Sequence, residues 1–312
     1  MSNDLAYTTE EVAKLLRVNR LTVYTLIKRG ELPAYRIGSR RFRVDAAEIE
    51  RYITKAKGRT ADEPPKSPFP VADPRLAPDQ FIIAGEDIIL DILAGYLGKV
   101  RPQTQILRHH INGLAGLMAL YQGQVNAVAI HLWDRETDSY NLPYVRRLLP
   151  GNRMVIINLA AQREGFYVAK GNPRGLSTWQ DLTRPGVRFI NRELGSGPRV
   201  LLDEKLQILA LNAGEITGYG DVKTSSLTVA ACVARGDADV GLGSEAAIRQ
   251  IAGIDFISLQ TERYDLVLPQ EDTAKPGFKF LLSILAANRF HRELDCLDCY
   301  DLTNTGTIIG ET

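Results

Sequence analysis

Apolar residues near the amino terminus recur at helical spacing and predict two short helices joined by a tight turn. In residues 10–16 the apolar side chains fall on one face, and Thr9 before them is a residue type that caps helix N-termini. After a turn at residues 17–19, residues 20–29 repeat the pattern, and Gly30 ends the second helix. The first 30 residues therefore predict a helix-turn-helix.

A change of period follows at once. Residues 34–37 and 40–44 alternate between apolar and polar side chains about a turn at Gly38 and Ser39, which predicts a two-stranded hairpin with arginines along one edge. Asp45 then caps a predicted third helix, whose apolar residues close a small core over the first two: Ile49, Tyr52 and Ile53.

From residue 81 onwards, short apolar runs alternate with helical patterns, which predicts parallel sheets covered by helices. The predicted strands are 81–85, 105–107, 127–130, 154–157, 187–190, 239–242 and 256–259. The predicted helices are 88–97, 114–121, 198–211, 227–234 and 246–251. Because the order of elements repeats, we expect an α/β fold with two lobes.

The two regions differ in net charge. Residues 1–60 contain 13 Lys and Arg against 7 Asp and Glu, whereas the remainder contains 25 against 30, which the total of +1 hides. A basic head on an acidic body suits counterion release at a nucleic-acid backbone. The predicted base-reading residues of the second helix are Arg20, Thr22, Thr25 and Lys28, and the predicted phosphate contacts of the hairpin are Arg40, Arg41 and Arg43. The alternative is a small helical domain for protein contacts.

Residues 6–54 resemble the winged helix-turn-helix of the excisionase and MerR-type families, which implies binding to double-stranded DNA. The next stretch, residues 55–78, is rich in proline and poor in large apolar residues, which predicts a semi-rigid linker. We therefore expect a DNA-binding head at 1–56, a linker at 57–79 and a body at 80–312 that is long enough for a full core.

The body resembles the periplasmic-binding-protein-like domain that is fused to such heads and is also found attached to molybdopterin-biosynthesis proteins. The segments that carry the resemblance include 113–117, 131–132, 191–203 and 238–243. The resemblance implies one lobe at 80–163 and 265–305, a second lobe at 164–264, and a ligand in the cleft between them.

Ligands of open α/β sheets collect at the carboxyl ends of strands, where helix N-termini present backbone N–H groups. The candidate ligand-binding residues at such junctions are Glu86, Asp87, Asn112, His131, Ser196, Arg199, Ser225 and Ser226. Ser196 and Arg199 form the strongest pair, because a hydroxyl, free amides and a guanidinium make an anion pocket. A well-capped helix with a surface arginine is the alternative there, and His131 fits either the cleft or the edge of a core.

The resemblance implies an oxyanion such as molybdate or tungstate as the ligand. Two positions depart from the family pattern: Glu86 stands where a small hydroxyl residue is usual, and Ser226 where a histidine is common. A carboxylate repels an anion unless it is protonated or paired with Arg199. A ligand with both an anionic and a cationic or hydroxyl part, such as an amino acid, therefore stays an alternative.

No cofactor, metal site or catalytic residue is expected. The chain has no P-loop or HExxH motif, and Gly241–Ala246 matches only the weak GxGxxA form of a dinucleotide fingerprint, so we predict that it is not an enzyme. Cys232 fits a buried thiol, whereas Cys296 and Cys299 form a CxxC pair without the further ligands of a closed zinc site. No apolar run reaches membrane-spanning length and no signal peptide is evident, which predicts a cytoplasmic protein without a membrane partner.

Together, these expectations predict a ligand-responsive transcriptional regulator. One head contacts few bases, so a homodimer or larger homo-oligomer is expected to reach a specific site. The alternative from another class is a molybdenum-cofactor-related or other small-metabolite-binding protein that uses the head for docking.

Overall fold

The computed structural model describes residues 6–16, 18–37, 41–46, 48, 49, 52, 80–249 and 251–312. The chain divides into two compact units, Met1–Val71 and Ala72–Thr312. Several predicted features lie outside the described residues: the hairpin turn, Arg40, Ile53 and the linker at 57–79.

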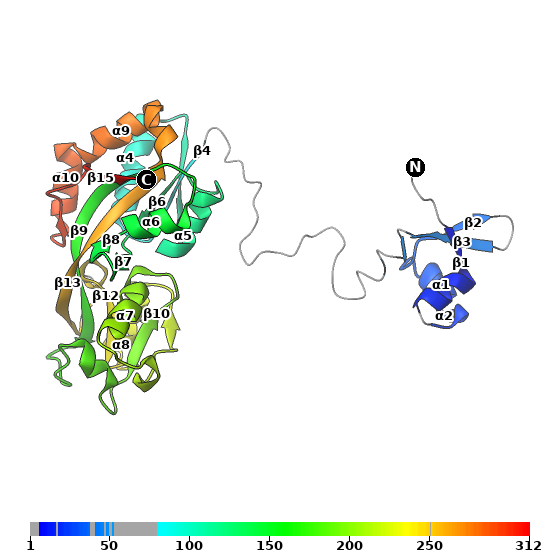
Figure 1. Cartoon of the computed structure of the whole chain (residues 1–312), viewed down its shortest axis with the longest axis horizontal. Coiled ribbons are helices and arrows are strands. Elements are labelled where there is room, and N and C mark those ends of the chain that lie inside the picture. Colours follow the sequence, from blue (N-terminus) through cyan, green and yellow to red (C-terminus); the bar gives the residue numbers. More distant parts are fainter. Residues whose placement is uncertain are drawn as a thin grey trace. The chain divides into compact units, whose positions relative to one another are not determined.

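The first unit combines short helices with a small antiparallel sheet (Figure 1). Its elements are β1 (Ala6–Thr8), α1 (Thr9–Leu16), α2 (Arg20–Lys28), β2 (Tyr35–Ile37) and β3 (Arg41–Asp45). The strand order is β1-β3-β2, so the predicted hairpin gains a third strand from the residues before α1. The buried core contains Val12, Ala13, Val23, Leu26, Leu32, Val44 and Ile49.

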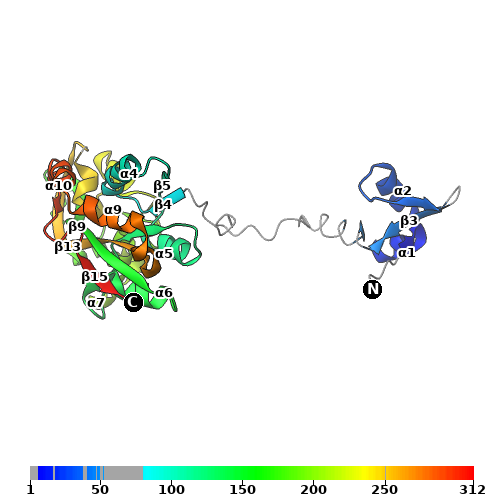
Figure 2. The same cartoon turned by 90° about the horizontal axis from the view of Figure 1, so that it is seen from above.

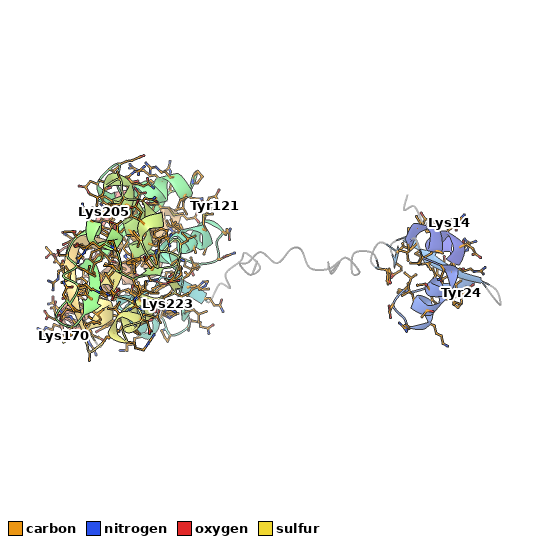
Figure 3. All side chains as sticks on the ribbon, turned by 90° about the horizontal axis from the view of Figure 1, so that it is seen from below. Lys14, Tyr24, Tyr121, Lys170, Lys205 and Lys223 are labelled. Carbon is orange, nitrogen blue, oxygen red and sulfur yellow. The ribbon has the colours of Figure 1, made fainter. Side chains whose placement is uncertain are left out.

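Local interactions fix the ends of these elements. The Asn19 side chain accepts a hydrogen bond of 2.8 Å from Thr22 N and caps α2. Tyr24 of α2, labelled in Figure 3, packs edge-on against Phe42 of β3, with the ring centroids 5.9 Å apart. The sheet and the second helix are thus held together by an aromatic contact as well as by the core.

The second unit contains the two lobes. The first lobe contains β4 (Gln80–Ala84), α4 (Ile89–Val100), β5 (Gln105–His109), α5 (Gly113–Tyr121), β6 (Ala127–Ile130), β7 (Trp133–Asp134), β8 (Ser139–Tyr140) and α6 (Leu142–Leu148). The carboxyl-terminal part of the chain returns to it with η4 (Gln270–Ala274), α9 (Pro276–Leu285), α10 (Asn288–Asp295), β14 (Tyr300–Asp301) and β15 (Ile308–Glu311). Strands β4, β5 and β6 are parallel, and the apolar faces of α4, α9 and α10 share one buried core.

The second lobe repeats the arrangement at smaller size. It contains η1 (Trp179–Thr183), β10 (Phe189–Arg192), α7 (Gly197–Ile208), η2 (Ala213–Glu215), β11 (Val222–Lys223), α8 (Ser226–Ala234), β12 (Val240–Ser244) and η3 (Glu245–Ile248). Strand β10 pairs in parallel with both β11 and β12, and buried clusters lie on the two faces of this sheet.

Two strands of 16 residues each, β9 (Met154–Ala169) and β13 (Ile254–Pro269), run through both lobes (Figure 1). They pair with each other along almost their whole length and join both lobes into one sheet of order β11-β10-β12-β9-β13-β6-β4-β5. Strand β15 lies beside β9, as Figure 2 also shows. The runs predicted at 154–157 and 256–259 are therefore parts of much longer strands. The sequence predicts only short runs there because polar residues such as Asn158 and Gln260 interrupt the apolar pattern.

No helix among the described residues is both long and apolar enough to cross a lipid bilayer. The mixed α/β architecture with two lobes and an amino-terminal helix-turn-helix agrees with the fold class predicted from the sequence.

One local cap gives a pH-dependent prediction. Ser177 N and Thr178 N donate hydrogen bonds of 2.9 and 2.8 Å to the Asp181 carboxylate, and these bonds lower its pKa from 3.8 to about 2. Asp181→Ala is expected to lower the free energy of unfolding by about 1 kcal/mol at pH 7. Because the folded-state pKa lies below the unfolded value, the contribution is present above pH 3.8 and is lost as pH falls towards 2. Urea unfolding should therefore show a smaller difference between parent and variant at pH 3 than at pH 7, and equal differences would contradict the assignment.

Candidate functional site

A cavity of about 290 Å³ lies where the two lobes meet. The carboxyl ends of β4 and β6 open towards it from the first lobe, and those of β10 and β12 from the second, as expected for open α/β sheets. The first lobe contributes Glu86, Asp87 and His131, and the second contributes Arg192, Ser225, Ser226 and Ser244. Gln162 of β9, Tyr264 of β13 and Tyr300 of β14 complete the polar lining.

Arg192 is the central cation of the cavity and is 3% exposed. Its guanidinium donates to Glu86 at 2.7 Å across the lobe junction, to Glu193 at 2.8 Å, and to the Ser226 hydroxyl at 2.7 Å. Burial opposes the charge, but these partners outweigh burial and raise the pKa of Arg192. The positive charge is thus already matched by two carboxylates.

His131 and Glu262 form a second charged pair. The ring nitrogen Nδ1 of His131 lies 2.7 Å from Glu262 Oε2, and the Gln162 amide donates to Glu262 Oε1 at 2.6 Å. The ring also packs edge-on against Tyr264 with centroids 5.4 Å apart. Burial alone lowers the pKa of His131, but the attraction to Glu262 reverses this and produces a net rise.

Glu164 lies beside this pair and is fully buried. Both of its carboxyl oxygens lack a hydrogen-bond partner among the described residues. Burial raises the pKa of Glu164 well above its ordinary value, and repulsion from Glu262 raises it further. A buried carboxyl group without partners is costly for a fold, and such groups concentrate at functional sites.

Asp87 is used mainly to hold the first lobe together. Its Oδ1 accepts hydrogen bonds from Tyr300 Oη at 2.5 Å and from Ile89 N at 2.9 Å, so it joins the start of α4 to β14. Burial raises the pKa of Asp87. We therefore assign Asp87 to the wall of the cavity rather than to direct ligand contact.

The lobes also contact each other directly at the start of α5. Leu114 N at the start of α5 donates to Gly195 O at 3.0 Å, and Asn112 Nδ2 donates to Leu194 O at 3.3 Å. Asn112 also caps α5 by accepting from Ala115 N at 3.1 Å. Both inter-lobe bonds connect the first lobe to the loop before α7, so the conformation described is closed.

Of the eight candidate ligand residues, the structure brings five together in the cavity: Glu86, Asp87, His131, Ser225 and Ser226. Asn112, Ser196 and Arg199 do not line it. The Ser196 hydroxyl donates to Glu193 O at 2.8 Å, while Arg199 contacts Asp203 at 3.0 Å and lies over the Tyr219 ring. The partner of Glu86 is therefore Arg192, not Arg199 as the sequence suggested.

Sequence reasoning missed four polar or charged residues in or near the cavity: Gln162, Glu164, Arg192 and Glu262. These residues lie in or at the end of strands, where apolar residues are expected. The sequence contains one signal for them. Gln, Glu and Arg are unusual within otherwise apolar strands, because such residues are rarely buried unless they have a polar partner.

In the head, Arg20 and Lys28 are exposed on α2. Arg20 contacts Glu10 at 2.6 Å and donates to the Tyr24 hydroxyl at 3.1 Å, so it must exchange these partners to reach a base. Thr25 is exposed and donates to Leu21 O at 3.0 Å.

Thr22 and the hairpin arginines have different roles in the fold. The Thr22 hydroxyl donates to Asn19 Oδ1 at 2.9 Å and supports the cap of α2. Arg43 donates to Ala6 O at 3.4 Å, which ties β3 to β1. Arg41 belongs to β3, but its side chain and the whole of Arg40 lie outside the described residues.

Two family models match the chain. Residues 94–286, more than half of the chain, match the PBP superfamily domain, and residues 6–57 match a helix-turn-helix domain. The chain is similar over its whole length to the uncharacterised protein YvgK of Bacillus subtilis, with 41% identity over 315 residues and complete coverage of both chains. Its head is 55% identical over 42 residues to a Mycobacterium tuberculosis protein provisionally described as DNA-binding, a match that covers 14% of this chain and 53% of that protein.

Among solved structures, the body is similar to a substrate-binding protein from Clostridium perfringens, provisionally assigned to a phosphate ABC transporter and solved with phosphate bound. The TM-score is 0.53 at 14% identity, and the match covers 71% of this chain and 99% of that one. At this identity the likeness concerns the fold, which agrees with the two lobes and the strands that join them. The chain therefore belongs to the PBP superfamily and carries a helix-turn-helix domain at its amino terminus.

Proposed function

We propose that the chain is a ligand-responsive DNA-binding regulator, in which a small solute binds between the lobes and changes the affinity of the head for DNA. The observation that carries this proposal is the cavity between the lobes of a PBP-type body, lined by Arg192, His131 and Glu86, in a chain that also carries a helix-turn-helix head. A solute that binds one lobe arrangement better than another shifts the balance between the two. We further propose that the protein works as a homodimer or larger homo-oligomer and is not an enzyme.

An oxyanion such as molybdate or tungstate is the first proposed effector. Arg192 and the serines at the start of α8 support it, because a guanidinium, hydroxyl groups and a helix N-terminus are suitable partners for an anion. Glu86 and Glu193 weigh against a simple anion, since they already balance the charge of Arg192.

An effector that carries a positive group as well is the second candidate. Glu164 and Glu262 support this candidate, because they place two carboxyl groups beside the cavity. An amino-acid-like ligand could direct its carboxylate towards Arg192 and its ammonium group towards these residues.

Thermal unfolding of the full chain with sodium molybdate, sodium tungstate and each common amino acid distinguishes these effectors. A solute present at 100 times its dissociation constant is expected to stabilise the folded chain by about 2.7 kcal/mol. Ser226→Ala should reduce the stabilisation by a solute that occupies the α8 end of the cavity, whereas Ser177→Ala, at an exposed serine that does not line the cavity, should not. A complete absence of stabilisation by all these solutes would contradict both proposed effectors.

The proposed head contacts give a prediction about DNA. Arg41→Ala should reduce the salt dependence of binding by about one counterion, since a lost phosphate contact lowers the slope of log K against log salt by about 0.9. Thr25→Ala should instead relax sequence preference at similar salt dependence. Fluorescence anisotropy with duplex DNA from upstream of the gene, at several salt concentrations, measures both effects; parent-like binding by both variants would contradict the assignment of the head.

A further inference from the structure

Glu164 is a buried carboxyl group beside the cavity whose hydrogen-bonding capacity the described residues do not satisfy. Its side chain is fully buried, yet neither carboxyl oxygen has a hydrogen-bond partner among the described residues. The nearby Gln162 Oε1 is also buried and without a partner there. Unmade hydrogen bonds at buried groups are costly, and binding of an ion is one of the ordinary ways to satisfy such groups.

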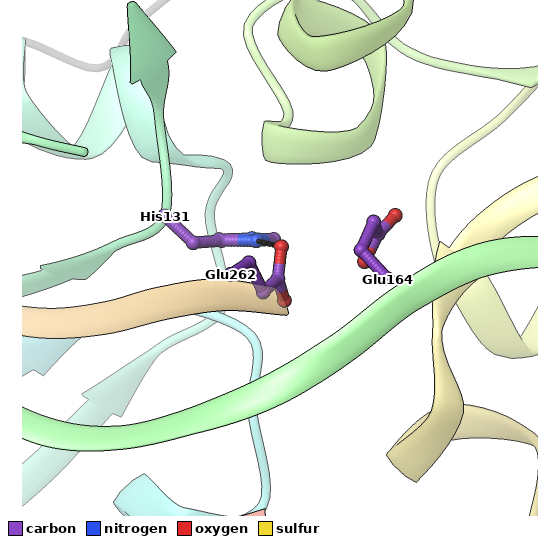
Figure 4. A group of neighbouring side chains, drawn as sticks. All are labelled: His131, Glu164 and Glu262. Carbon is purple, nitrogen blue, oxygen red and sulfur yellow. Dashed lines mark hydrogen bonds and ion pairs between the residues drawn. The ribbon is translucent and has the colours of Figure 1, made fainter. Parts of the chain in front are cut away.

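The neighbours of Glu164 indicate which kind of group would interact with its carboxyl oxygens. Donor atoms of His131, Glu164 and Glu262 all lie within 4.8 Å of one another. Figure 4 shows the Glu164 carboxyl group facing the His131–Glu262 pair across a short gap. The three residues come from the end of β6 and from the two long strands, so the cluster lies at the junction of the lobes.

The donor set suits a transition-metal cation. One imidazole and two carboxylates are typical ligands of Mn²⁺, Fe²⁺, Co²⁺ and Zn²⁺, whereas Ca²⁺ and Mg²⁺ prefer oxygen ligands alone. Gln162 donates to Glu262 Oε1 at 2.6 Å, which orients that carboxylate in the way that outer partners orient metal ligands. We propose that His131, Glu164 and Glu262 bind a divalent transition-metal cation at the junction of the two lobes.

The charges around the cluster agree with a cation. Two carboxylates balance a divalent ion, and the nearby Arg192 is itself balanced by Glu86 and Glu193. Three protein ligands leave coordination positions open, and His131 also lines the cavity. The bound cation therefore provides an attachment point for an anionic effector at a place where the protein alone presents carboxylates.

Mn²⁺ is the most informative probe, because Cys296 and Cys299 offer Zn²⁺ a second place to bind. The full chain, treated with a chelator and free of an affinity tag, is titrated with MnCl₂, and electron paramagnetic resonance measures the loss of the free-ion signal. One Mn²⁺ is expected per chain. Glu164→Gln and His131→Gln are each expected to weaken binding by at least about tenfold, since even outer partners of metal ligands matter by 10- to 100-fold.

Glu245→Gln is the matched control. Glu245 follows β12 near the cluster, but its carboxylate is bound by Arg163 at 2.6 Å and is not part of the cluster. This variant should bind Mn²⁺ like the parent. Thermal unfolding without metal checks the fold. Glu164→Gln should unfold at the parent temperature or higher, because an amide replaces a carboxyl group that has no hydrogen-bond partner among the described residues.

Failure of parent Mn²⁺ binding, or equal binding by parent and Glu164→Gln, would overturn the proposed metal site. Metal binding itself does not depend on the proposed function. Only the expected effect of the bound metal on DNA binding rests on that function, so DNA affinity is measured separately with and without MnCl₂. Stoichiometric Mn²⁺ binding that leaves DNA affinity unchanged supports the site and contradicts regulation by the metal alone.

Discussion

Gly197→Ala is expected to prevent full closure of the lobes and to lower the affinity of the cavity for its ligands by at least about tenfold, equivalent to about 1.4 kcal/mol. A Cβ atom at this position would lie 2.4–2.7 Å from three atoms of the His131 ring, which belongs to the opposite lobe. The ring cannot simply move aside, because Glu262 and Tyr264 hold it. Overpacking of this kind costs about 1–3 kcal/mol.

Mn²⁺ binding and thermal unfolding of the same variant measure these two effects. Gly95→Ala in α4 is the control, since a Cβ atom there meets nothing within 4 Å. It is expected to stabilise the protein by up to about 1 kcal/mol, because alanine favours a helix over glycine. If Gly197→Ala unfolded at the parent temperature and bound Mn²⁺ with parent affinity, the closed arrangement would not be the binding state.

Arg192→Gln is expected to lower the free energy of unfolding by about 3 kcal/mol, the lower end for breaking a buried ion pair, because its carboxylate partners are partly exposed. The substitution leaves Glu86 and Glu193 without their shared cation and removes the donor to Ser226. Stability and ligand binding should therefore fall together. Urea unfolding measures the first and thermal shifts with the oxyanions measure the second.

An exposed arginine provides the comparison. Arg235 pairs with Asp237 at 2.7 Å, and its side chain is 61% exposed. Arg235→Gln is expected to change the free energy of unfolding by less than about 1 kcal/mol, since solvent screens surface ion pairs. Similar losses in the two variants would show that Arg192 is not the buried centre of a charge network.

The sequence was sufficient to predict the helices and strands whose apolar residues recur at a clear spacing. The first two helices of the head follow from their apolar spacing, and the alternation of the body follows from short apolar runs such as 127–130. The full length of the two long strands was not predicted, because polar residues such as Asn158, Gln162 and Glu164 interrupt the apolar pattern. Such residues are expected to end a strand, whereas here Asn158 donates to Asp265 and Gln162 donates to Glu262 on the neighbouring strand.

The cavity was predicted only in part, for a geometric reason. Residues directly after strand ends, such as Glu86 and His131, could be found because strand ends meet at one edge of a sheet. Glu262 could not, because it reaches Gln162 only through the antiparallel register of β13 on β9. The arginine at the lobe junction was misassigned, since sequence favoured Arg199 at a helix start and packing directs Arg199 to Asp203 and away from the cavity.

The most direct test of the central claim is the affinity of the full chain for duplex DNA from upstream of its gene, measured by fluorescence anisotropy with and without a solute that thermal unfolding has shown to bind. Sodium molybdate, sodium tungstate and the amino acids are the probes. We predict that a bound probe changes DNA affinity by about fivefold or more in the parent, within the usual range of coupling energies, and not in Arg192→Gln. DNA affinity that stays the same while the cavity is occupied, or no DNA binding at all, would contradict the account.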